Sequence, residues 1–360
     1  MSEFKPGLEG VVAFETEIAE PDRDGGALRY RGVDIEDLVG RVPFEQVWGL
    51  LVDNQPLPGL EPAAPYVAED LTGNAPADLQ SATAHLSGAW GLGQLIDITD
   101  EQAHADLARL SATMISIVAQ SARFADGNLT PVDPALVASG GTAATRFLLE
   151  WLGEADPKHV QALDTYWICT AEHGLNASTF TARVVASTGA DCGAALASAV
   201  GALSGPLHGG APARVLPMLD GAAAADSIDQ FVVDLLDAGD RLMGFGHRVY
   251  RAEDPRSRLL RGTAMDLGSR RFEVAVELER AALAELHRRK PDRVLATNVE
   301  FWSAVVLDVA EIPPRLAPAM FACSRTAGWS AHIMEQKRLG RLVRPSAHYI
   351  GPGPRPLPSA

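Results

Sequence analysis

The stretch Gly244-Phe245-Gly246-His247-Arg248-Val249-Tyr250-Arg251 is the most informative run in this chain. Two glycines flank an aromatic residue, and glycine lets a ligand come close to the backbone. The histidine that follows can change its protonation near neutral pH, and arginines stand at positions 248, 251, 256 and 258. The run predicts a loop that places an acid–base group beside an anionic ligand. Taken alone, such a histidine is more often structural, so matching parts are needed elsewhere.

Length and composition narrow the class of protein. The chain has 360 residues, 47% of them hydrophobic, which is enough for two domains or one large one around a sizeable core. The net charge of −15 argues against a general nucleic-acid binder. After Glu335 the chain has no Asp or Glu but keeps five Lys and Arg residues. This basic tail is either a solvated end or a segment that meets an anion or an acidic partner surface.

The cysteines and the N-terminus bear on the compartment. Cys169, Cys192 and Cys323 are few and far apart, which predicts neither a disulfide framework nor a zinc site. Residues 1–6 lack an apolar signal core. No uncharged apolar run approaches the ~18 residues that a membrane span needs. We therefore expect a cytoplasmic protein without a bound metal or a membrane partner.

Strand-like patterning is confined to the front of the chain. Residues 11–18 are β-prone, residues 22–26 supply turn residues, and residues 27–32 can return as a second strand. Beyond residue 35 the apolar spacing is helical. Helices are expected near 44–51, 100–124, 134–152, 159–185 with an interruption at Gly174, 191–203, 227–240, 298–310 and 316–338, with two or three more within 256–289. We predict an all-α protein with a small N-terminal β element and an extended tail from Pro345.

The run Pro206-Leu207-His208-Gly209-Gly210-Ala211-Pro212 carries a second histidine. Pro212 suits the first turn of a helix, because its missing N–H costs nothing there. His208 is then expected near a helix N-terminus, where the helix dipole disfavours imidazolium. A histidine kept neutral can donate a hydrogen bond to a carbonyl oxygen that gains negative charge. The alternative is a turn histidine satisfied by backbone groups.

Two further stretches combine polar residues with helix boundaries. Residues 172–179 interrupt a helical pattern and contain His173, which is either a ligand group or part of a capping interruption. Glu300 stands at the start of a helix beside Phe301 and Trp302. It is either an acidic residue favoured by the helix dipole or a general base in an apolar surround.

Arg325 is a lone arginine in an otherwise apolar helical stretch. A buried guanidinium is costly unless an anion pairs with it, so we expect a carboxylate of the protein or of a ligand beside it. Arg344 repeats the idea in the tail, where an exposed arginine is the simpler interpretation. Three histidines, one carboxylate and several arginines together suit a site that binds a small dicarboxylate and moves protons.

In combination these motifs closely resemble those of citrate synthase. They occur in the family's order and cover about residues 10–350. The matching stretches are Tyr30-Arg31-Gly32-Val33-Asp34-Ile35, His173-Gly174-Leu175-Asn176-Ala177-Ser178, Leu207-His208-Gly209-Gly210-Ala211, Gly246-His247-Arg248-Val249-Tyr250, Asp254-Pro255-Arg256, Ser324-Arg325-Thr326-Ala327-Gly328 and Arg344-Pro345.

The resemblance implies a mostly helical, two-domain subunit in a homodimer. The large domain would hold residues 1–211 and 319–360, and the small domain, residues 212–318, would close over the cleft between them. The active site would be shared, with Arg344 reaching into the cleft of the partner subunit. The short chain leaves no room for an added N-terminal regulatory domain, which favours a simple dimer over the NADH-inhibited hexamer.

The implied reaction condenses acetyl-CoA with oxaloacetate and water to give citrate and CoA, without a permanently bound cofactor. Glu300 would remove a methyl proton, neutral His208 would hydrogen-bond the thioester oxygen, and His247 would polarise and protonate the ketone oxygen. The residues that would hold oxaloacetate are His173, Arg256, Arg325 and Arg344. CoA would lie near the loop that contains Gly244, Phe245, Gly246, Arg248 and Arg251.

One departure from the family pattern concerns the base, which is usually aspartate. Glu300 adds a methylene and moves the carboxylate by about 1.5 Å if the backbone is unchanged. A misplacement of ~1 Å can cost roughly a hundredfold in rate, so the change bears on rate more than on fold. Two alternatives stay open: a 2-methylcitrate synthase that uses propionyl-CoA, and a non-catalytic sensor of oxaloacetate or CoA. The retained histidines and arginines argue against the sensor.

Overall fold

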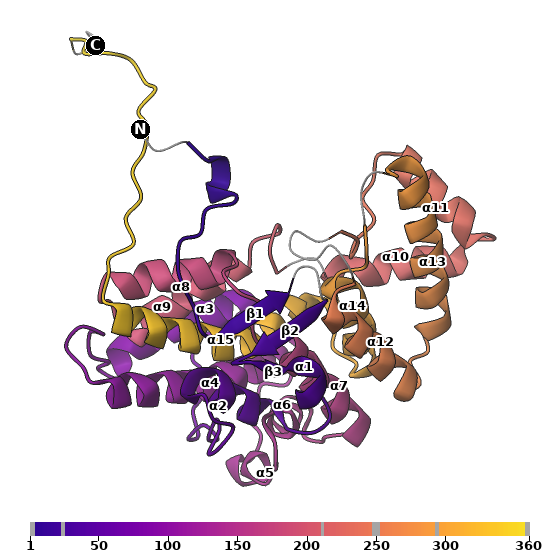
Figure 1. Ribbon diagram of the computed structural model, residues 1–360. Helices are drawn as coiled ribbons and strands as arrows, with labels where there is room; N and C mark the ends of the chain where they lie inside the picture. Colours follow the sequence, from indigo (N-terminus) through magenta and orange to yellow (C-terminus); the bar gives the residue numbers. More distant parts are fainter. Residues whose placement is uncertain (1–3, 23–25, 210–211, 247–252, 292–294, 357–360) are drawn as a thin grey trace.

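The computed structural model describes residues 4–22, 26–209, 212–246, 253–291 and 295–356 (Figure 1). Helices dominate it, which confirms the all-α prediction with a small N-terminal β element. The strands are β1 (Ala19–Asp22), β2 (Ala27–Tyr30) and β3 (Val33–Asp34). The helices are α1 (Ile35–Leu38), α2 (Phe44–Asp53), α3 (Ala75–Ala89), α4 (Asp100–Ala125), α5 (Pro134–Ala138), α6 (Ala143–Leu152), α7 (Pro157–Thr170), α8 (Ala177–Ser187), α9 (Cys192–Leu203), α10 (Pro212–Ala224), α11 (Ile228–Asp237), α12 (Pro255–Asp266), α13 (Phe272–Arg289), α14 (Val299–Val309) and α15 (Ala317–Leu339), with short 3-10 helices η1 (Pro6–Leu8) and η2 (Pro314–Leu316).

The β element is an antiparallel sheet in the order β1-β2-β3. Its register pairs Ala19 with Tyr30 and Asp22 with Ala27, so the predicted return strand is confirmed. The prediction that the first strand occupies residues 11–18 is wrong, because β1 begins only at Ala19. The preceding segment bonds to a helix instead: the Glu17 N–H donates to Glu335 Oε1 on α15 at 3.1 Å.

Helix boundaries follow local capping chemistry. The predicted helix over 100–124 is confirmed as α4, and its N-cap Thr99 accepts a hydrogen bond from the Gln102 N–H at 3.2 Å. The single helix predicted over 134–152 is wrong, because α5 ends at Ala138 and α6 starts at Ala143. Two glycines separate them, and Thr142 caps the second helix. Helix α3 was not predicted.

Helix α15 runs through the middle of the protein. Its residues from Ala319 to Met334 are buried on every side, as expected for a helix inside a core rather than on its surface. It packs against α2, α4, α7, α8 and α9. The hydroxyls of Ser111 on α4 and Ser330 on α15 lie 3.2 Å apart, so these two buried polar groups pair with each other.

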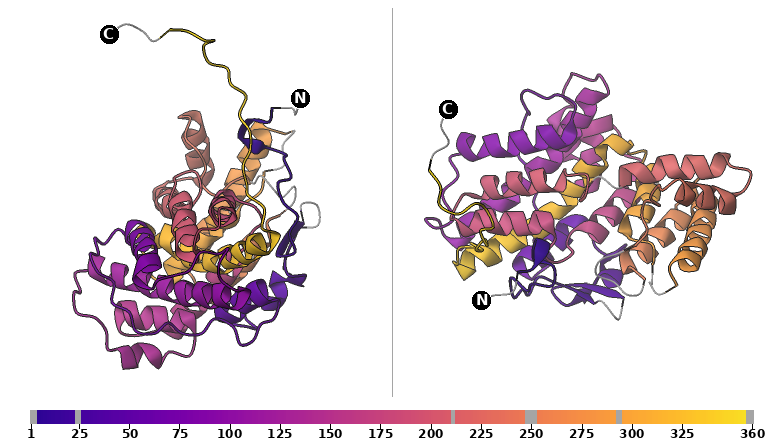
Figure 2. Two further views of the ribbon diagram at one scale, coloured as in Figure 1. Left: turned by 90° about the vertical axis from the view of Figure 1, so that its left-hand side faces the viewer. Right: turned by 90° about the horizontal axis from the view of Figure 1, so that it is seen from above.

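Helices α10 to α14 form a group beside the rest of the chain (Figures 1 and 2). Within it α11, α13 and α10 pack on one another, while α12 and α14 contact α7 of the main body. The C-terminal segment leaves the end of α15 and runs away from the body in both figures. The domain boundaries expected at 211 and 319 stay a prediction.

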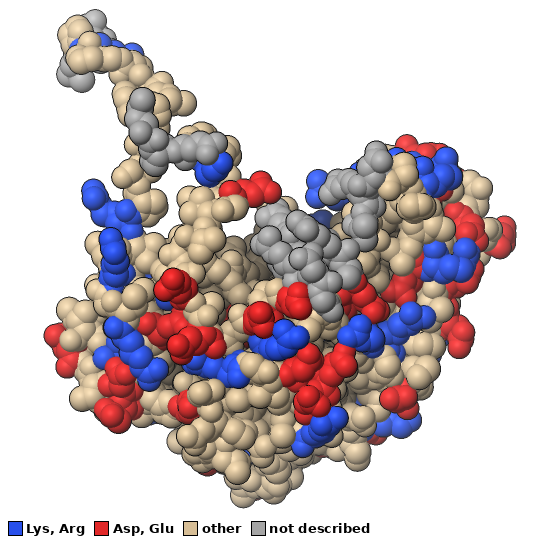
Figure 3. All heavy atoms as spheres, viewed as in Figure 1, with Lys and Arg blue, Asp and Glu red and all other residues tan. Residues whose placement is uncertain are grey.

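The surface carries both signs of charge. On the face in Figure 3, lysine and arginine side chains lie among acidic ones and form no separate basic surface. Ion pairs account for part of this mixing, for example Arg258 with Glu253 at 3.0 Å. Among the described residues, none of the helices has the length and apolarity to cross a membrane.

Gly328 on α15 gives a test of this packing. A Cβ at Gly328 would meet the Ala171 carbonyl oxygen at 2.7 Å and Glu172 Oε2 closer still. We expect Gly328→Ala to lower the free energy of unfolding by about 2–3 kcal/mol. Gly262→Ala is the matched control, since nothing lies within 4 Å of a Cβ there, and it should be neutral or stabilise by up to ~1 kcal/mol. Urea denaturation measures both, and equal effects would contradict the packing argument.

Candidate active site

The start of α8 organises one side of the site. Asn176 is the N-cap, and its Oδ1 accepts hydrogen bonds from the Thr179 N–H at 3.1 Å and from the Ser178 hydroxyl at 2.8 Å. The Ser178 Oγ also accepts a hydrogen bond from Trp329 Nε1 of α15 at 3.2 Å. The polar interruption predicted at residues 172–179 is therefore a capped helix start fixed to the core.

His208 lies against this helix start. Its Nε2 accepts a hydrogen bond from the Ser178 N–H at 3.3 Å and lies 2.9 Å from Ser178 Oγ. A backbone N–H is only a donor, so Nε2 is the unprotonated nitrogen and Nδ1 carries the proton. The ring also packs edge-on against Phe321, with centroids 6.3 Å apart.

The imidazole of His208 is neutral at physiological pH. Burial and, as the smaller cause, the positive charge of Arg325 together lower its pKa to about 4. We predicted a neutral histidine from the helix dipole. The structure supports the neutral state in two ways. The ring is partly buried, and it lies at the N-terminus of α8, where Nε2 accepts from a backbone N–H.

The first part of the Gly244 run holds the start of α14. Phe245 bridges Thr297, the Gly246 N–H donates to the Ala296 carbonyl at 2.8 Å, and the Asn298 N–H donates to the Gly244 carbonyl at 2.9 Å. Gly244 has φ of +85°, and a Cβ on it would lie 2.6 Å from the Cβ of Phe301. Glycine is required there on both counts.

Glu300 sits in the first turn of α14. Asn298 caps this helix, accepting from the Glu300 N–H at 3.0 Å, while its Nδ2 donates to the Gly246 carbonyl at 3.0 Å. Burial raises the pKa of Glu300 to about 7; the nearby charge of Arg256 and the Asn298 hydrogen bond oppose this rise. A carboxyl group with this pKa can accept a proton near neutral pH.

Glu279 of α13 accepts hydrogen bonds from residues around the same helix start. This role was not predicted from the sequence. Its Oε1 accepts hydrogen bonds from the Thr297 hydroxyl and, at 2.9 Å, from Trp302 Nε1. These two donors lie on either side of Glu300 in the sequence. No local pattern in the sequence connects α13 to this turn.

Arg325 is buried on α15, as predicted, with 2% of its surface exposed. Its Nε donates to the Thr170 carbonyl at 2.7 Å, and its guanidinium lies 4.7 Å from the Phe321 ring centroid. Burial lowers its pKa, and the negative charge of Glu172 opposes this shift. Its Nη1 has no hydrogen-bond partner among the described residues. An unpaired buried donor of this kind is suited to an anionic ligand.

A buried chain of charged groups continues from Glu172. Its Oε1 lies 3.3 Å from His332 Nε2, and His332 Nδ1 lies 3.0 Å from Arg183 Nη1. Arginine only donates, so Nδ1 accepts and Nε2–H donates to Glu172. Arg183 also pairs with Glu335, which binds the N-terminal segment. The sequence reasoning missed this chain.

Arg256 is also buried, at the N-terminus of α12. Its Nε and Nη2 donate to the two carboxylate oxygens of the N-cap Asp254 at 2.9 and 2.7 Å. Its charge acts on both Glu300 and Arg325. Four predicted residues are thus linked by electrostatic interactions in the order His208, Arg325, Arg256 and Glu300. The N-termini of α8, α12 and α14 and the middle of α15 position them.

Other predicted residues are placed differently. His173 is half-buried in the loop between α7 and α8. Arg344 is exposed in the extended C-terminal segment, and its contribution to a second subunit stays a prediction. His247, Arg248 and Arg251 lie outside the described residues. Within the described ranges, no three His, Cys, Asp or Glu side chains gather in a group that could hold a metal ion.

Known proteins resemble this chain along most of its sequence. The family described as "Citrate synthase, C-terminal domain" matches residues 7–346. The chain is 60% identical over 354 residues to "Putative citrate synthase 2" of Mycobacterium tuberculosis, covering 98% of this chain and 94% of the relative. It is 33% identical to the 2-methylcitrate synthase of Shewanella oneidensis, covering 97% and 95%.

A solved structure gives the same result. The ternary complex of citrate synthase from Thermoplasma acidophilum with carboxymethyl coenzyme A and oxaloacetate superposes with a TM-score of 0.83 at 26% identity, covering 99% of this chain and 98% of that one. This chain belongs to the citrate synthase family and is an acyltransferase of the citrate synthase type.

Proposed function

We propose that this enzyme condenses acetyl-CoA with oxaloacetate and hydrolyses the product thioester to citrate and CoA. One observation carries the proposal: a neutral His208 lies within electrostatic range of the buried Arg325, a proton-accepting Glu300 lies within range of the buried Arg256, and the two guanidinium groups act on each other. This set suits proton removal beside a carbonyl group in a site that binds a dicarboxylate. The substrate analogue and oxaloacetate bound to the Thermoplasma acidophilum enzyme support both substrates.

In the first step the Glu300 carboxylate takes a proton from the methyl carbon of acetyl-CoA. The electron pair of that C–H bond moves toward the thioester oxygen, which gains negative charge. The protonated Nδ1 of His208 donates a hydrogen bond to this oxygen. Because burial keeps His208 neutral, the ring stabilises the enolate oxygen as a neutral hydrogen-bond donor.

In the second step the enolate carbon forms a C–C bond to the ketone carbon of oxaloacetate, and His247 delivers a proton to the ketone oxygen. His173, Arg256, Arg325 and Arg344 of the partner subunit hold the carboxylates of oxaloacetate. The guanidinium of Arg325 is buried, and its Nη1 has no hydrogen-bond partner among the described residues. Both observations support its role as a contact to a carboxylate of oxaloacetate. Fixed positive charge offsets the negative charge that develops during attack.

In the last step water hydrolyses the citryl thioester and releases the CoA thiol. The loop of Gly244, Phe245, Gly246, Arg248 and Arg251 binds CoA. The small domain, residues 212–318, closes over the cleft of the large domain and keeps water away from the enolate. Helix α7 contacts α12 and α14, which belong to the small domain, and also α15, which belongs to the large domain. These contacts support a closing motion about α7.

The acyl donor has a second candidate. The 33% identity to the Shewanella oneidensis 2-methylcitrate synthase favours propionyl-CoA as the alternative. The two donors differ by one methylene, which a pocket discriminates by only about 1–3 kcal/mol. Comparing turnover with the two donors decides between them.

Substitution of Glu300 tests the base. Glu300→Gln cannot accept a proton, so thiol release should fall by about 10²–10⁴-fold, whereas Glu300→Asp should keep measurable turnover with the same donor preference. Thiol release is followed with oxaloacetate and either acetyl-CoA or propionyl-CoA. If Glu300→Gln turns over like the wild type, Glu300 is not the base.

The melting temperature at pH 8 provides the control for folding. Burial raises the pKa of Glu300 above that of an unfolded chain, so its ionised form costs free energy in the folded state above that pKa. Glu300→Gln should therefore melt no lower than the wild type.

A wild-type enzyme that binds oxaloacetate but releases no thiol with either donor would overturn the proposed reaction.

The pH dependence of kcat/KM tests the same assignment. The base must be ionised, and the pKa of Glu300 is about 7. The rate should rise nearly tenfold per pH unit well below pH 7 and level off above it. His208, with a pKa of about 4, remains neutral across pH 5.5–8.5 and should add no second limb. A profile that is flat from pH 5.5 to 8.5 would contradict the assignment.

Arg344→Ala tests the shared site. The variant should raise the KM for oxaloacetate by tenfold or more, because a charged hydrogen bond to a carboxylate is worth ~1.5–3 kcal/mol. The elution volume of the dimer should not change. Arg355→Ala, in the same exposed segment, is the control and should behave like the wild type. Unchanged kinetics in Arg344→Ala would remove the claim of a shared site.

A further inference from the structure

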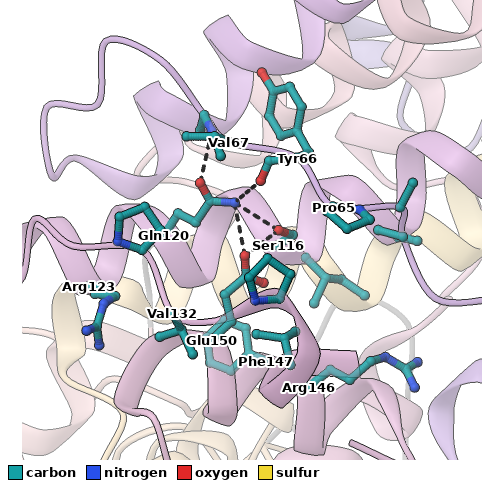
Figure 4. A pocket seen from close by; sticks show the side chains of 18 of the residues that line it. Pro65, Tyr66, Val67, Ser116, Gln120, Arg123, Val132, Arg146, Phe147 and Glu150 are labelled. Atoms are coloured by element: carbon teal, nitrogen blue, oxygen red, sulfur yellow. Dashed lines mark hydrogen bonds between the residues drawn. The ribbon is translucent and has the colours of Figure 1, made fainter. Parts of the chain in front are cut away.

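A second cavity lies apart from the candidate active site. Its volume is about 430 Å³, and none of the residues around it belongs to the set proposed for catalysis. It lies between α4 and α6 and is bounded by α5 and by two non-helical segments, residues 60–71 and residues 128–132 (Figure 4). The cavity is large enough for a two-ring organic molecule.

Most of the cavity wall is apolar. Leu60 and Val67 contribute from the first segment, Leu129 from the second, Ile115 from α4 and Phe147 from α6. An apolar wall with a few convergent polar groups is the usual composition of a small-molecule site. Three of the polar side chains of this cavity converge at one place.

That place is the carboxyl group of Glu150 on α6. Its Oε1 accepts hydrogen bonds from the Ser116 hydroxyl at 2.7 Å and from Gln120 Nε2 at 3.0 Å. Figure 4 shows the three side chains converging from α4 and α6. Both donors go to the same oxygen, so Oε2 keeps its capacity to accept.

The amide of Gln120 also ties the cavity wall to α4. Its Nε2 donates to the Tyr66 carbonyl at 2.9 Å, and its Oε1 accepts from the Ala68 N–H at 2.9 Å. The segment that closes the cavity is therefore held by the same side chain that orients Glu150. The carboxyl group and the wall form one hydrogen-bonded unit.

Glu150 forms no ion pair with any Lys, Arg or His of the described chain. The two arginines at the cavity are engaged elsewhere: Arg123 Nη1 donates to the Trp151 carbonyl and Arg146 Nη1 to the Gly140 carbonyl, both at 3.0 Å. In Figure 4 both guanidinium groups point away from Glu150. Burial raises the pKa of Glu150 to about 7, and only the Ser116 and Gln120 hydrogen bonds oppose the rise.

Glu150 is half-buried at the cavity wall, and its carboxylate has no positive partner among the described residues. The missing partner is a cation, and the apolar wall sets the character of the rest of the molecule. We propose that this cavity is a second ligand site, which takes a small aromatic or alkyl amine whose ammonium group pairs with Glu150. The site is independent of the proposed reaction.

Calorimetric titration at pH 8 tests the assignment with 2-(naphthalen-1-yl)ethylamine as the probe and 2-(naphthalen-1-yl)ethanol as its uncharged counterpart. The amine should bind the wild type with a dissociation constant on the order of 0.1–1 mM, as its size allows. The alcohol should bind at least tenfold more weakly, since it lacks the charge. Equal binding of the two probes, or no binding of the amine to folded protein, would overturn the proposal.

Variants locate the bound probe. Glu150→Gln keeps an oxygen for Ser116 and Gln120 but removes the charge, so amine binding should weaken about tenfold or more. Glu154→Gln removes an exposed charge four residues away and should change nothing. Both variants should release thiol at the wild-type rate, because neither residue belongs to the catalytic set.

A filling variant tests the cavity itself. Ala112→Phe places a ring in the cavity from α4, and Ala63→Phe does so from the non-helical wall; either, if folded, should abolish amine binding. Saturating oxaloacetate and CoA should leave binding in the wild type unchanged. Binding that survives both filling variants, or that oxaloacetate and CoA displace, would place the amine elsewhere and overturn the proposal.

Discussion

The burial of the Arg325 guanidinium inside α15 is the constraint on which the candidate site depends. A charge taken out of water must be met by partners or it destabilises the fold. Here Nε donates to the Thr170 carbonyl, the guanidinium lies near the Phe321 ring, and the negative charge of Glu172 acts on it. The remaining Nη1 is unpaired, so the protein carries a positive group whose last partner can come from a substrate.

Glu172 extends this constraint across the molecule, because it is buried too and needs a partner of its own. His332 supplies it, and Arg183 then contacts both His332 and Glu335. Positions 325, 332 and 335 follow the repeat of one helix face, so a single helix balances these charges. The chain of contacts ends on the N-terminal segment through Glu335, and this fixes that segment relative to the site.

The sequence allowed prediction of the features that have local causes. Apolar spacing located α4, and the need for glycine at position 244 follows from its backbone. The break between α5 and α6 was missed because apolar spacing continues across two glycines. The partners of Glu172 and the brace from Glu279 could not be foreseen, since they join helices far apart in the chain and leave no periodic trace. Burial of Arg325 was predictable, but the identity of its partners was not.

Glu300 and Glu150 show how surroundings give the same carboxyl group different uses. Burial raises the pKa of each to about 7, so solvation alone does not distinguish them. The difference lies in the neighbouring charges: Arg256 acts on Glu300, whereas only neutral donors act on Glu150. Beside buried guanidinium groups, a weakly acidic carboxyl can lose and regain a proton next to an anionic substrate. At the wall of the apolar cavity, where both arginines donate to backbone carbonyl groups instead, the same carboxyl lacks a positive counterpart, and that is the physical reason to assign it a ligand rather than a reaction.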